Sequence, residues 1–83
     1  MTTVTGTKTI TNTEAAVFAG SSVLANRVFL YVQNLDDSVV ILINRRPVEP
    51  GEKIKLKLKA SESVTIMGQS TGRAVRALVQ EVA

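Results

Sequence analysis

The sequence predicts an all-β protein, a small antiparallel β-sandwich or barrel of six to seven short strands. After residue 14, short runs rich in Val, Ile and Leu alternate with turn residues, as in strands joined by short connections. Several of these runs also alternate apolar and polar residues, so each strand would bury one face. The chain has 83 residues, no cysteine and 45% hydrophobic residues. So much apolar surface in so small a scaffold predicts burial against other subunits.

The first thirteen residues differ from the rest, and we expect two parts, an extended N-terminal arm (1–13) and a sandwich domain (14–83). Threonine occupies every second position from Thr3 to Thr13. Because threonine is β-branched, this stretch favours extended backbone. Residues 1–6 fit either a frayed terminus or part of the arm, and for residues 7–13 we expect ordering by adding a strand to a neighbouring subunit. Its candidate contact residues are Thr7, Thr9, Ile10 and Thr11.

The first expected strands are 15–19, 28–33 and 39–43, the last two forming a hairpin with a five-residue loop. In that loop, Asp36 and Asp37 predict a turn in which an aspartate side chain bonds its own backbone. The run 39–43 is apolar on both faces. We therefore expect one face to meet the core and the other a partner, with Val40 and Leu42 as candidate contact residues.

The second half of the chain predicts strands at 52–59 and 63–67, with a turn at 68–72. Pro47 and the Pro50–Gly51 pair interrupt the connection before the first of these strands, and Arg45 and Arg46 are expected in a loop, where they could bind a partner's carboxylates. Residues 73–82 fit either a helix or a strand. The strands before it favour a strand.

A stripe of lysines and a pair of aromatic residues leave alternatives open. Lys53, Lys55 and Lys57 alternate along one strand, which suits an acidic protein, a phosphate chain or simple solvation. Phe29 and Tyr31 share one strand face. On an OB-like barrel they would stack on nucleotide bases; otherwise they cover a second core layer or a subunit contact.

The composition argues against catalysis. The chain has no histidine and no cysteine, which excludes Ser-His-Asp and Cys-His chemistry and Cys-based zinc sites. Its glutamates show no recognisable pairing, and no phosphate-binding glycine loop is present. We expect no enzyme, cofactor or metal site. The longest apolar run, 39–43, is far shorter than the roughly 20 residues of a membrane helix, so no membrane partner is expected.

The segment Asn26–Asn34, NRVFLYVQN, resembles a strand of small virion structural proteins of tailed bacteriophages. These proteins share an Arg-led aliphatic strand ending in Gln-Asn, a short polar loop and a Val/Ile-rich strand. The Pro50–Gly51 turn before an alternating strand, and a terminal strand with a late glutamate, here Glu81, extend the likeness over residues 14–82. The threonine-rich arm lies outside it.

The resemblance implies a non-enzymatic capsid decoration or cement protein on the exterior of the virion, made in the host cytoplasm. It would bind the major capsid protein and itself, as a dimer or trimer. Another particle role, at the head–tail junction or the base of a fibre, is the first alternative. A single-stranded nucleic-acid binder is the alternative from a different class, with nucleic acid the less favoured partner.

Overall fold

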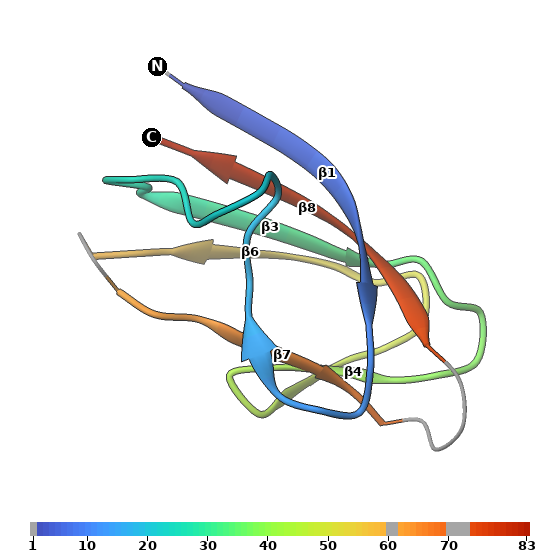
Figure 1. The fold of residues 1–83 in the computed structure, drawn as a ribbon. Coiled ribbons are helices and arrows are strands. Elements are labelled where there is room, and N and C mark those ends of the chain that lie inside the picture. Colours follow the sequence, from blue (N-terminus) through green and yellow to red (C-terminus); the bar gives the residue numbers. More distant parts are fainter. Residues whose placement is uncertain (1, 60–61, 70–73) are drawn as a thin grey trace.

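A computed structural model describes residues 2–59, 62–69 and 74–83, which form eight strands in two facing sheets (Figure 1). The strands are β1 (Thr3–Ile10), β2 (Ala15–Ala16), β3 (Phe29–Asn34), β4 (Ile41–Ile43), β5 (Arg46–Val48), β6 (Lys53–Lys57), β7 (Thr65–Gly68) and β8 (Val75–Val82). We call the sheet with strand order β1-β8-β3-β6 sheet A and the sheet with order β2-β7-β4-β5 sheet B. All neighbouring strands are antiparallel.

The predicted all-β sandwich is confirmed, with eight strands instead of six or seven. The ambiguous C-terminal segment forms a strand, β8, over its described part. Of the turn expected at 68–72, Gly68 belongs to β7, and residues 70–72 lie outside the described residues.

The core follows the period-two alternation of the sequence, because successive side chains of a strand point to opposite faces. Leu30 and Val32 of β3 are fully buried, and so are Ala77 and Val79 of the neighbouring β8. Sheet B contributes buried aliphatic residues that include Ile41, Ile43, Val48 and Ile66. One aliphatic core therefore joins the two sheets.

The hairpin predicted between residues 28–33 and 39–43 is wrong. β3 pairs with β6 and β8 in sheet A, whereas β4 pairs with β5 and β7 in sheet B. The polar loop between them thus carries the chain from one sheet to the other. Asp36 nevertheless makes the expected turn, since its carboxylate accepts hydrogen bonds from the backbone N–H groups of Ser38 and Val39.

Asn34 explains why the chain leaves sheet A at this point. Its side chain is fully buried, and its amide nitrogen donates to the carbonyls of Val39 and Val48, at 2.8 and 3.0 Å. Its amide oxygen accepts from the N–H of Asp36 at 2.9 Å. One buried amide therefore holds the crossover loop and the end of β5 together.

Replacing Asn34 by alanine should destabilise the protein strongly. The buried carbonyl of Val48 and the partly buried carbonyl of Val39 would lose their donor, at about 1–3 kcal/mol for each buried group left unpaired. Chemical denaturation followed by circular dichroism measures the loss. Asp37→Ala changes an exposed side chain of the same loop and should stay within about 0.5 kcal/mol of the parent. Equal effects of the two substitutions would contradict this role for Asn34.

The β4–β5 hairpin was not expected, because Pro47 reads as a strand breaker. The turn consists of Asn44 and Arg45, both with positive φ (49° and 65°), the conformation of a two-residue type I′ turn. β5 is an edge strand. Ile43 and Arg46 close the turn and bond to each other. Because the hydrogen-bonding direction alternates along a strand, the nitrogen of the next residue, Pro47, points away from β4. Its missing N–H therefore breaks no bond of the ladder. Arg46 therefore lies in a strand, not a loop.

Residues 3–10, expected in an arm that pairs with a neighbouring subunit, form the first strand of the chain's own sheet A. β1 pairs with β8 along its whole length, and Ile10 is buried in the core. The segment 17–20 crosses the inner face of β1 so closely that a side chain at Gly6 would overlap the carbonyl oxygen of Ala19. Both described chain ends lie together, with Thr2 and Ala83 exchanging backbone hydrogen bonds (Figure 1).

Candidate interaction surface

The outer face of sheet A gathers most of the residues that the sequence nominated as contacts. Side chains that face each other across paired strands share a face, and the register gives three rows of four residues. The rows are Thr3–Val82–Phe29–Lys57, Thr5–Gln80–Tyr31–Lys55 and Thr7–Leu78–Gln33–Lys53. We call these twelve residues, with Thr9 and Arg76 at the end of the sheet, the sheet A face.

The sheet A face is basic. It carries Lys53, Lys55, Lys57 and Arg76, all exposed. The four strands contain one carboxylate, Glu81, which is fully buried on the inner side. The lysines lie on the edge strand β6, and the threonines lie on the opposite edge strand, β1. The lysine charges therefore line the β6 edge of the face, whereas the β1 edge is neutral and polar.

Lysines cover the two aromatic rings of this face. The ammonium nitrogen of Lys55 lies 4.4 Å from the ring centre of Phe29 and 5.7 Å from that of Tyr31. Lys53 lies 5.6 Å from the ring centre of Tyr31. Both rings are half-buried on the outer face, so they form no second core layer within the described chain. A shallow cavity of about 140 Å³ adjoins Tyr31, between Thr5 and Lys53.

The other nominated residues lie elsewhere. Val40 and Leu42 are half-buried in and beside β4 of sheet B, where Leu42 pairs with Met67 and Pro47. Arg45 and Arg46 lie at the β4–β5 turn, and Arg45 approaches Glu14 at 3.5 Å. Ile10 belongs to the core, while Thr11 is exposed beyond β1. The nominated residues therefore occupy at least two separate surfaces.

A buried ion pair between Arg27 and Glu81 was not predicted from the sequence. Their closest atoms, Nη1 and Oε2, are 2.8 Å apart, and both side chains are buried. Glu81 also accepts hydrogen bonds from the backbone N–H groups of Ala19 and Leu24, at 2.7 and 2.9 Å. Arg27 donates to the carbonyl of Val17 at 2.7 Å. The pair thus fastens the long connection between β2 and β3 onto sheet A.

Sequence reasoning missed this pair because its members are far apart in the chain. One signal was available. Glu81 lies on the β8 face shared by Val75, Ala77 and Val79, where a carboxylate requires a partner.

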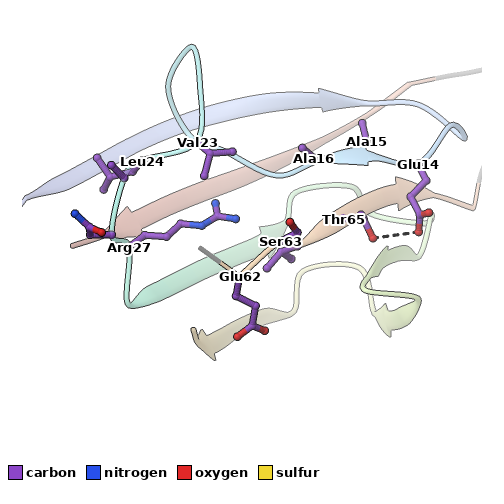
Figure 2. Close-up of a pocket in the computed structure, with 12 residues that line it drawn as sticks. Glu14, Ala15, Ala16, Val23, Leu24, Arg27, Glu62, Ser63 and Thr65 are labelled. Atoms are coloured by element: carbon purple, nitrogen blue, oxygen red, sulfur yellow. Dashed lines mark hydrogen bonds between the residues drawn. The ribbon is translucent and has the colours of Figure 1, made fainter. Parts of the chain in front are cut away.

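A pocket of about 560 Å³ opens beside this connection, between residues 23–27 and the start of β7 (Figure 2). Its rim carries Glu14, Glu62 and Ser63. Glu14 accepts a hydrogen bond from the hydroxyl of Thr65 at 3.1 Å, marked in Figure 2. Arg27 lines the pocket but is engaged by Glu81 and Val17. The polar side chains are thus largely committed to bonds that hold the fold.

Two other kinds of feature are absent from the described ranges. No group of His, Cys, Asp or Glu side chains there could hold a metal ion. Those residues also include no helix with the length and apolar character that a membrane crossing requires. No protein-family model matches the chain, nor does any curated protein or solved structure.

The two charges of the buried pair should be energetically coupled, so that removing both costs less stability than the sum of the two single losses. Glu81→Gln leaves the Arg27 guanidinium buried without its counter-charge, a loss of about 3–5 kcal/mol. The double variant Arg27→Met/Glu81→Gln should be less destabilised than the sum of the single variants, measured by urea denaturation. Arg76→Met makes the same arginine replacement at an exposed position and should be nearly neutral. Additive single effects would contradict the coupling.

Proposed function

We propose that the chain is a non-enzymatic virion structural protein of a tailed bacteriophage, a decoration protein that binds the major capsid protein and stabilises the head. Two lines support this. The strand and turn pattern of residues 14–82 resembles such proteins, and the sheet A face offers a broad basic surface without a carboxylate side chain. The sheet A face is the observation that carries the mechanism.

The contact with the capsid works by charge complementarity between the lysines of the sheet A face and acidic side chains of the capsid. An acidic patch on the capsid exterior would face Lys53, Lys55 and Lys57, which stand in one line on β6. Such complementarity speeds and orients docking more than it tightens it. Affinity comes from repetition, because an oligomer that engages several capsid subunits at once gains avidity from individually weak contacts.

The triple variant Lys53→Gln/Lys55→Gln/Lys57→Gln should lose most of its binding to purified capsids, measured by co-sedimentation at low and high salt. Binding of the parent chain should weaken as salt rises, since exposed charges are screened. The control Arg45→Gln/Arg46→Gln removes exposed positive charge at the β4–β5 turn, outside the sheet A face, and should bind nearly as well. Equal losses would show that net charge, and not the sheet A face, directs binding.

The number of copies on a purified particle separates decoration from the alternative structural roles. A decoration protein should be present in proportion to the capsid subunits. A chain confined to the head–tail junction or a fibre base would appear as one ring or a few clusters in an imaged particle, and would contradict the proposal.

Nucleic-acid binding is the competing function for the same face, and the ring contacts argue against it. Base stacking needs open aromatic faces, whereas lysines lie over Phe29 and Tyr31. We expect a fluorescent single-stranded oligonucleotide to show no binding that depends on these rings. Salt-sensitive binding that Phe29→Leu/Tyr31→Leu abolishes would favour the nucleic-acid function instead.

A further inference from the structure

The two sheets end in four edge strands, and three of them are poorly suited to pairing with another chain. β2 has two residues, and β5 has three and contains Pro47. β6 carries Lys53, Lys55 and Lys57, and lysines on an edge strand discourage pairing. β1 differs from all three: it has eight residues, no proline and a neutral outer face of threonines.

The free edge of β1 is formed by its threonines. Thr2 and Ala83 exchange both backbone hydrogen bonds. Because such pairs alternate along an antiparallel ladder, Val4, Gly6, Lys8 and Ile10 also bond to β8. The N–H and C=O groups of Thr3, Thr5, Thr7 and Thr9 then point away from β8. Within the described chain, β1 pairs with no strand other than β8.

We propose that β1 pairs antiparallel with β1 of a second copy of this chain, joining two A sheets into one continuous sheet of eight strands. A twofold axis at Gly6 places Thr3 opposite Thr9 and Thr5 opposite Thr7. Each hydrogen-bonded pair across the contact is then threonine with threonine. Cross-strand threonine pairs stabilise a sheet, so the strict threonine alternation makes this edge complementary to itself.

Charge favours β1 over β6 as the edge that pairs with its own copy. Joining two β6 strands would place two rows of lysines side by side, and like charges on facing residues are destabilising. The single charged residue of β1 is Lys8. Its ammonium group is held on the inner side by a hydrogen bond to the carbonyl of Gly20, and it lies 4.5 Å from the ring centre of Phe18. It therefore does not guard the edge.

This dimer does not depend on the proposed capsid function and can be tested on the purified chain alone. Sedimentation equilibrium should show a reversible dimer. Thr5→Pro removes an N–H that faces the free edge and leaves the backbone hydrogen bonds to β8 in place, so the dimer dissociation constant should rise about tenfold from the loss of two hydrogen bonds. Lys55→Pro removes the corresponding N–H from the edge of β6 and should leave the dimer intact.

Disulfide trapping tests the register, because the chain has no cysteine of its own. Facing residues of a hydrogen-bonded pair lie about 5.5 Å apart at Cα, within reach of a disulfide. Thr5→Cys and Thr7→Cys variants should cross-link when mixed and oxidised, and much less when each is oxidised alone. The proposal is overturned by a parent chain that stays monomeric, by a dimer that Thr5→Pro does not weaken, or by cross-linking that is equal in the separate and mixed samples.

Discussion

The fold depends on one buried carboxylate. Glu81 lies among the aliphatic side chains of β8, where an ionised group is tolerated only with full pairing. Arg27 and the backbone N–H groups of Ala19 and Leu24 supply that pairing. All three residues belong to the connection between β2 and β3, which contains no helix or strand. The carboxylate therefore fixes the path of the longest irregular segment, and this segment in turn covers the inner face of β1.

Because the β2–β3 connection is held on the inner face of sheet A, the outer face of this sheet stays free for contacts. The crossing segment lies on the inner face of β1, so the outer face of sheet A stays open from its threonine edge to its lysine edge. The two edges differ in charge. The neutral β1 edge suits another copy of the chain, and the lysine-bearing β6 edge suits an acidic surface. The apolar residues of sheet B, such as Leu42 and Met67, form a separate surface.

Local patterns in the sequence predicted the strands well and the pairing of strands poorly. Alternation placed Phe29 and Tyr31 on one strand face, and it placed Lys53, Lys55 and Lys57 on one side of another strand, as the structure has them. The predicted hairpin between β3 and β4 was wrong because a loop rich in turn residues is compatible with two paths, a return to the same sheet or a crossover to the other sheet. The hydrogen bonds of the buried Asn34 side chain favour the crossover. The Arg27–Glu81 pair, and the placement of Arg45 and Lys53 on different sheets, depend on tertiary geometry that spacing along the chain does not encode.

The position of β8 bears on how the protein is made. β8 follows β1 and β3 along the chain, yet it lies between them in sheet A. Until it emerges, β1 has no partner in its own chain and β3 lacks one of its two neighbours. Contacts between distant parts of a chain slow folding. Sheet A can therefore assemble fully only once β8 has been synthesised, and until then both edges of β1 are unpaired.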